Sequence, residues 1–211
     1  MTEIPNRIFV TGAPGCKWTS VTHLLETVDW ANLSDRTEER HYDHHVFQGH
    51  HGAYYGLPFR KYEFNCCVDK DHLDSAYSSP LPGKFMKAHD WGYMLDDLAE
   101  NFKGDWIVMV MRNDIDCFSW WNQHGGFVTK YPSYETYYPD AVMMSEIMKL
   151  NDRYSSFAQK HDLQWNYFTP RWVKENFGKD LTDKEMSILN NKNMLDFSDY
   201  FNKVMVSIMK L

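Results

Sequence analysis

The chain opens with an apolar segment that runs into a glycine-bearing loop and then into a helical pattern. Arg7–Thr11 is predicted to be a short strand, and the sequence GAPGCK follows it from Gly12 to Lys17. A helix is predicted to about residue 29 from apolar residues at helical spacing, which are Val21, Leu24, Leu25 and Val28. A strand, a glycine loop and a helix in this order are typical of the first unit of an α/β domain.

The rest of the chain favours the same fold class. Trp106–Met111 is a continuous apolar run, typical of a central parallel strand covered on both faces. Further strands are predicted at Lys84–His89, at Lys61–Val68 and, as the last one, at Gln164–Phe168. Helices are predicted at 93–102, at 116–122 and after Pro139, where the buried stripe is Met143, Ile147, Leu150, Tyr154 and Phe157. Two helices are predicted to finish the chain, the last with Phe201, Val204, Met205 and Ile208 on one face.

These elements predict a single domain over residues 1–211, a three-layer α/β/α fold with a central parallel sheet. Two inserted loops, at about 36–58 and 124–139, carry no clear periodicity. The net charge of −7 argues against a broad basic surface for nucleic acid, and no apolar run is long enough for a membrane span. Four cysteines without a spaced framework, and no secretory signal pattern, favour a cytoplasmic protein.

The loop after the first strand is a candidate anion site. Glycine loops before a helix turn backbone N–H groups towards phosphates, and here Lys17 adds a charge while Thr19 and Ser20 add hydroxyls. The string is not a Walker A motif, and it resembles the GAPGxGKGT loop of nucleotide kinases with one glycine missing. A tight strand-to-helix turn with a solvated lysine is the alternative.

Two more strings join this loop in an ordered set: PGCKWTS at 14–20, KAH at 87–89 and RNDIDCFSWW at 112–121. The set resembles that of sulfotransferases that use 3′-phosphoadenosine 5′-phosphosulfate (PAPS), which have P-K-S-G-T-T-W, K-T-H and R-N-P-x-D-x-x-x-S-Y-Y in this order. The resemblance covers roughly residues 7–125. It implies the P-loop NTPase-like fold of the sulfotransferase type.

The resemblance also implies site roles and a reaction, the transfer of a sulfuryl group to a hydroxyl or amine of a small-molecule, glycan or lipid acceptor. His89 would be the general base, with Lys87 beside it, and Arg112 and Ser119 would bind the 3′-phosphate. The 5′-phosphosulfate would lie in the loop formed by Gly12, Pro14, Gly15, Cys16, Lys17, Trp18, Thr19 and Ser20, and Lys17 would stabilise charge on the leaving phosphate. No metal is required by this scheme.

The string matches are incomplete, and two other functions stay open. The family lysine of the loop falls on Gly15, Ser119 lies one position early, and the family's C-terminal R-K-G-x-x-G-D-W string is absent. A P-loop kinase that uses ATP and magnesium is one alternative, and a binding module of the same fold without catalysis is the other. For single residues, His89 pairing with Asp90 and Arg112 pairing with nearby aspartates are the structural interpretations.

Three further groups of residues are left without an assigned role. The histidine cluster, His41, His44, His45, His50 and His51, is interpreted as part of a lid or acceptor loop and not as a zinc site, because no cysteine is near and the spacing is irregular. Tyrosines in the 124–139 loop are candidates for an acceptor pocket. Trp18, Trp120 and Trp121 are candidates for stacking on adenine or for core packing. The acceptor and the oligomeric state are not predicted.

Overall fold

The computed structural model describes most of the chain outside the two inserted loops and the segment before the C-terminal strand. The described residues are 3–34, 41–42, 53–54, 68–75, 82–123, 126, 137–183, 185 and 204–211. The predicted strand at Lys61–Val68 lies outside them except for Val68, which is not in a strand. Most of the histidine cluster and of the 124–139 loop also lies outside.

The described residues form an α/β fold around a mixed five-stranded sheet with the order β4-β1-β5-β7-β6. Its strands are β1 (Arg7–Gly12), β4 (Lys84–Lys87), β5 (Trp106–Met111), β6 (Asn166–Tyr167) and β7 (Met205–Lys210). β4, β1 and β5 are parallel, whereas β7 runs antiparallel to β5 and to β6. β2 (His41–Tyr42) and β3 (Ala53–Tyr54) form a separate antiparallel pair.

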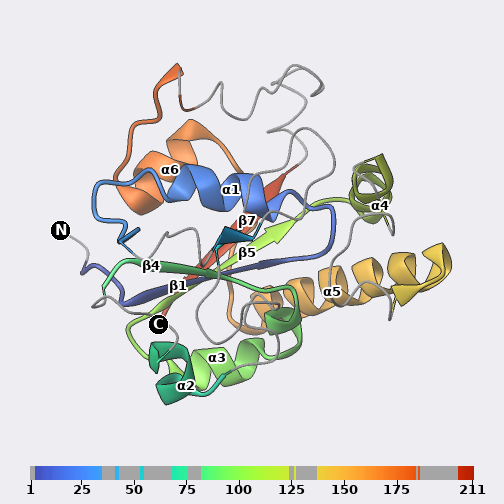
Figure 1. Ribbon diagram of the computed structural model, residues 1–211, viewed down its shortest axis with the longest axis horizontal. Coiled ribbons are helices and arrows are strands. Elements are labelled where there is room, and N and C mark those ends of the chain that lie inside the picture. Colours follow the sequence, from blue (N-terminus) through green and yellow to red (C-terminus); the bar gives the residue numbers. More distant parts are fainter. Residues whose placement is uncertain are drawn as a thin grey trace.

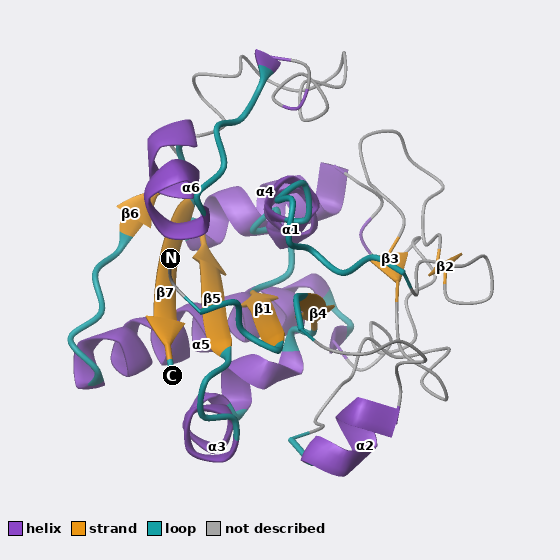
Figure 2. Ribbon diagram, turned by 90° about the vertical axis from the view of Figure 1, so that its left-hand side faces the viewer, coloured by secondary structure: helices purple, strands orange, loops and turns teal. Residues whose placement is uncertain are grey.

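Helices cover both faces of the sheet (Figure 2). α1 (Trp18–Leu25) and α6 (Pro170–Phe177) lie over one face, and α3 (Leu95–Asn101) and α5 (Asp140–Lys160) lie over the other. α4 (Asp114–Gln123) lies beyond the carboxyl end of β5, and the 3₁₀ helix η2 (Asp90–Tyr93) follows β4 (Figure 1). None of the helices in the described ranges is long and apolar enough to cross a lipid bilayer.

Two predictions about the second half of the chain have different outcomes. The stripe on α5 is confirmed, because all five of its predicted residues are buried. The predicted C-terminal helix is wrong: residues 205–210 form β7, an interior strand of the sheet, and the sheet is therefore not purely parallel. Val206 and Ser207 are consecutive and both buried, so the strand has no clean alternation to distinguish it from a helix.

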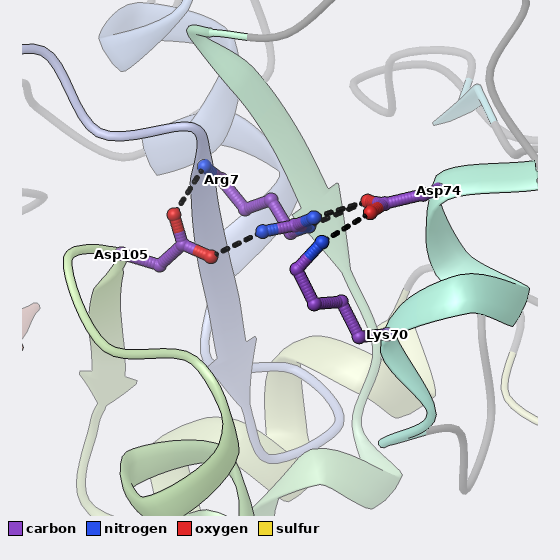
Figure 3. Close-up of polar contacts among 4 residues, drawn as sticks. All are labelled: Arg7, Lys70, Asp74 and Asp105. Carbon is purple, nitrogen blue, oxygen red and sulfur yellow. Dashed lines mark hydrogen bonds and ion pairs between the residues drawn. The ribbon is translucent and has the colours of Figure 1, made fainter.

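A partly buried ion-pair network ties α2 (Lys70–Ser75) to the amino end of the sheet (Figure 3). Arg7, at the start of β1, donates from Nη1 to the Asp105 carboxylate at 2.7 Å and from Nε to Asp74 at 3.0 Å. Lys70 pairs with the same Asp74 across one turn of α2. The network lies at the end of the sheet opposite to the predicted site.

Candidate functional site

The parallel strands bring the predicted site residues to one edge of the sheet. Val10 is in register with Lys87, and Gly12 is in register with Val110, so the three strands end at nearly the same level. His89 follows β4, the glycine loop follows β1, and Arg112 follows β5 directly. This is the carboxyl edge, where parallel α/β sheets bind their ligands.

The loop between β1 and α1 is in close backbone contact with α4. Gly15 has a φ of 79°, and a Cβ atom there would lie 1.9 Å from the carbonyl oxygen of Cys117. Inside the loop, the Cys16 N–H donates to the Ala13 carbonyl at 3.1 Å, which closes a tight turn. The position therefore requires glycine both for its backbone conformation and for its contact with α4.

Lys17 is the residue immediately before α1, and it is held in a defined position. Its backbone is left-handed, with a φ of 71°, and its side chain is 7% exposed. The Nζ atom lies 3.6 Å from the centroid of the Trp120 ring on α4, a cation–π contact. The amides of Trp18, Thr19 and Ser20 in the first turn of α1 have no partner within the helix. A lysine and three such amides at one loop are suited to an anion.

His89 is fixed by the loop itself. Its Nδ1 atom is hydrogen-bonded to the backbone carbonyl of Gly12. Because a carbonyl oxygen can only accept, Nδ1 carries the proton, and Nε2 then carries the lone pair of the neutral ring. Burial lowers the pKa of His89 to about 4, the Lys87 charge acts in the same direction, and the bond to Gly12 opposes both. The imidazole is therefore neutral at pH 7 and competent to accept a proton at Nε2.

The predicted residues around His89 form one cluster. The Trp18 ring lies 4.3 Å from the His89 ring, centroid to centroid, and the Lys87 Nζ atom lies 5.7 Å from the Trp18 centroid. Lys87 is 7% exposed. Trp18 thus lies against His89 and makes a cation–π contact with Lys87. A second tryptophan, Trp121, is buried against Gly15.

Arg112, which follows β5, contacts the loop at Gly15. It is 6% exposed, and its Nη1 atom donates to the Gly15 carbonyl at 3.3 Å. Its Nε–H is buried and has no hydrogen-bond partner among the residues that the structure describes. A buried guanidinium N–H without an acceptor is costly, and an anion oxygen would satisfy it.

The structure does not bring Ser119 to this cluster. The side chain is exposed on α4 and accepts a hydrogen bond from Gln123 at 3.0 Å. Two residues along a helix turn the side chain by about 200°, so Ser119 lies on the side of α4 away from Cys117 and the loop. A role for Ser119 in phosphate binding stays a prediction.

Neither cysteine of the site is a nucleophile near neutral pH. Cys16 and Cys117 are both fully buried. Burial raises the pKa of the Cys16 thiol well above its usual value, and burial raises that of Cys117 to about 12. Both thiols are therefore protonated and act as packing groups, and the Cys16 N–H is used in the bond to the Ala13 carbonyl.

Three polar residues that the sequence did not indicate as part of the site contact its residues, namely Thr11, Tyr154 and Asn151. Thr11 donates to the carbonyl of His89 at 3.3 Å and contacts the Tyr154 hydroxyl at 3.1 Å. Asn151 donates to the carbonyl of Arg112 at 2.9 Å and to Asp114 at 2.6 Å. The available signal was a polar residue next to the apolar stripe of α5, where a polar group requires a partner.

A pocket and the histidine cluster are not part of this site. A pocket of ≈ 430 Å³ between η2, α3 and α5 is lined by residues that include Tyr93, Asp97 and Arg153, and none of the predicted site residues lines it. Among the described residues, no group of three or more His, Cys, Asp or Glu side chains could hold a metal ion. Of the histidine cluster, only His41 is described, in β2.

No family model, no curated protein and no solved structure matches the chain. The resemblance to PAPS-dependent sulfotransferases therefore depends on three short strings of the sequence.

Proposed function

We propose that the protein is a sulfotransferase that moves a sulfuryl group from PAPS to a hydroxyl or amine acceptor. The observation that carries the proposal is that the three strings meet at one loop. His89 is bonded to the Gly12 carbonyl, and Arg112 is bonded to the Gly15 carbonyl, so both flank the residues that would hold the donor. A fold of the P-loop NTPase type, with the loop as its phosphate cradle, is part of this proposal.

In the proposed reaction the acceptor oxygen or nitrogen attacks the sulfur, and the bond between sulfur and the 5′-phosphate oxygen breaks. The proton of the acceptor goes to Nε2 of His89. The charge that appears on the leaving phosphate is stabilised by Lys17 and by the first-turn amides of α1. The negative charge of the bound donor also raises the pKa of His89 from its low value, which makes the ring a better base.

Lys87 and Arg112 have supporting roles in this proposal. Lys87, near Trp18, adds positive charge on the β4 side of the site. Arg112 donates a hydrogen bond from its buried Nε–H to the 3′-phosphate. This phosphate group distinguishes PAPS from most other adenosine nucleotides. The acceptor is a small molecule, glycan or lipid, and the proposed compartment is the cytoplasm.

Titration calorimetry with adenosine 3′,5′-bisphosphate, the product of the donor, tests the proposal. Binding of this ligand and weak binding of ATP with magnesium support a sulfotransferase. The reverse preference supports the kinase alternative, whose motivation is the GAPGCK string and the hydroxyl of Thr19 in the first turn of α1. Binding without transfer from labelled PAPS to any hydroxyl or amine acceptor supports a non-catalytic module.

Lys17→Met locates the ligand. It removes the charge and keeps the length of the side chain next to Trp120, and the affinity for adenosine 3′,5′-bisphosphate is expected to fall about tenfold or more. Lys103→Met is the matched control, because Lys103 donates to a backbone carbonyl of α3. Equal affinities of the two variants for the nucleotide would mean that the nucleotide does not bind at the loop.

A further inference from the structure

The buried face of α5 carries polar side chains among apolar ones, and two of them, Asn151 and Tyr154, reach the candidate site. Asn151 is 7% exposed and Tyr154 is fully buried, and both lie between a helix and the sheet. Buried polar groups cost free energy unless they are hydrogen-bonded. The Tyr154 hydroxyl is bonded to Thr11, which in turn is bonded to His89. The Asn151 amide is bonded to the carbonyl of Arg112 itself.

The link from Tyr154 to His89 has a defined direction. The Thr11 hydroxyl has one proton and donates it to the His89 carbonyl. Thr11 therefore accepts from the Tyr154 hydroxyl. Burial raises the pKa of Tyr154 well above its usual value, so the hydroxyl remains a donor over the whole useful pH range. His89 is thus held by its backbone through Thr11 and by its ring through Gly12, two consecutive residues of β1.

The link from Asn151 acts on the turn between β5 and α4. One Nδ2 group donates both to the carbonyl of Arg112 and to the carboxylate of Asp114 in the first turn of α4. The two amide protons are thereby used, and the Oδ1 atom of Asn151 is buried with no partner in the described part of the chain. The orientation of the amide is fixed by these two acceptors, and it sets the backbone from which the Arg112 side chain extends.

We propose that Asn151 and Tyr154 are positioning residues, through which one helix face sets both Arg112 and His89. The inference deepens the proposed function and rests on it, because it assigns Asn151 to the nucleotide-binding half of the site and Tyr154 to the base. The two residues lie about one helical turn apart on α5, so a single rigid element fixes both halves of the site relative to each other.

Tyr154→Phe tests the first link without removing packing volume. In the unliganded wild type, the ¹⁵N shifts of His89 are expected to report one tautomer, with the proton on Nδ1. In Tyr154→Phe and in Thr11→Val the ring is expected to give mixed shifts. The double variant is expected to show no more tautomer mixing at His89 than Thr11→Val alone, because both changes break the same link. A pure Nδ1–H tautomer in both single variants would overturn this half of the proposal.

Asn151→Leu tests the second link. The affinity for adenosine 3′,5′-bisphosphate is expected to fall about tenfold, with the His89 tautomer unchanged, and the ¹H–¹⁵N signal of the Arg112 Nε–H is expected to move in the unliganded protein. Asn151→Ser, which cannot reach Arg112, repeats the test if the leucine variant does not fold. An unchanged affinity together with an unchanged Arg112 signal would overturn this half.

Ile147→Val is the matched control, since Ile147 is fully buried on the same helix and is apolar. It is expected to lower stability and to leave the His89 shifts, the Arg112 signal and the affinity as in the wild type. If Ile147→Val changes these three readouts as much as the polar variants do, the changes come from a general loss of packing, and the proposal is wrong. If the wild type does not bind the nucleotide, the proposed function fails, and the two spectroscopic readouts still decide the positioning roles.

Discussion

Asp105 accepts two hydrogen bonds from the same residue, one from the backbone N–H of Arg7 at 2.9 Å and one from its guanidinium at 2.7 Å. Both side chains are 2% exposed. The pair thus joins the first residue of β1 to the residue that precedes β5, and Asp74 extends it to α2 (Figure 3). The amino end of the sheet is held by charge, whereas its carboxyl end carries the candidate site.

Arg7→Met is expected to destabilise the protein by about 3 kcal/mol or more, because it leaves the Asp105 carboxylate buried without its charged partner. Lys70→Met is the control, since Lys70 pairs with Asp74 on an exposed helix surface, and it is expected to cost less than about 1 kcal/mol. Urea unfolding followed by circular dichroism measures both. Similar small losses in the two variants would mean that the buried pair contributes nothing beyond a surface pair.

Gly15→Ala is expected to abolish nucleotide binding and to destabilise the protein by about 3 kcal/mol, since it adds strain at a positive φ and overlap with the Cys117 carbonyl. Gly104 provides the comparison: its φ is 87°, and a Cβ atom there has no neighbour within 4 Å among the described residues. Gly104→Ala is expected to cost about 1 kcal/mol of strain alone. Denaturant unfolding and calorimetry separate the two, and equal effects would refute the close packing of the loop on α4.

His89→Asn is expected to lower turnover by roughly 10²–10⁴ and to leave the affinity for adenosine 3′,5′-bisphosphate nearly unchanged. The asparagine amide can replace Nδ1–H as the donor to the Gly12 carbonyl, but it has no basic nitrogen. Transfer from labelled PAPS and calorimetry on the same preparation give the two numbers. Full activity in this variant would exclude His89 as the base.

Stability is expected to fall as the pH falls from about 6.5 to about 4, because of His89. Its pKa in the folded protein is lowered to about 4 from an ordinary 6.5. Between these values the unfolded chain binds a proton that the folded protein does not, so acid favours unfolding. The contribution is at most about 3 kcal/mol.

The measurement is the free energy of unfolding of the wild type and of His89→Asn at several pH values. Carboxylates with lowered pKa values, such as Asp74, lose their own stabilising contribution as they become protonated at lower pH, and the subtraction removes them. The difference between the proteins is expected to change between pH 6.5 and 4 and to be flat above. A flat difference throughout would place the folded-state pKa near its ordinary value.

The sequence predicted the parallel half of the fold well and the antiparallel half poorly. Strand β5 lies at its predicted bounds, because a continuous apolar run between polar residues has one simple interpretation. The segment 205–210 was predicted to be helical, because local pattern cannot reveal a partner as distant in sequence as β5. Its conformation is decided by pairing on both sides, which no window of the sequence contains.

The site was predictable to the level of which strand ends carry it. Gly12, His89 and Arg112 were each placed from short strings, and the parallel register brings them together. The sequence did not predict the contacts behind them, such as that of Asn151 with Arg112. These contacts depend on how α5 lies against the sheet, and helix packing angles are not encoded in local spacing.

The position of β7 between β5 and β6 has a consequence for how the chain matures. β7 pairs with β5 on one side and with β6 on the other, so on the ribosome one edge of β5 lacks its β7 partner until residues 205–210 have been made. Closing so long a stretch of chain is slow compared with forming the neighbouring parallel pairs. Until that pairing forms, the apolar edge of β5 can pair with other chains.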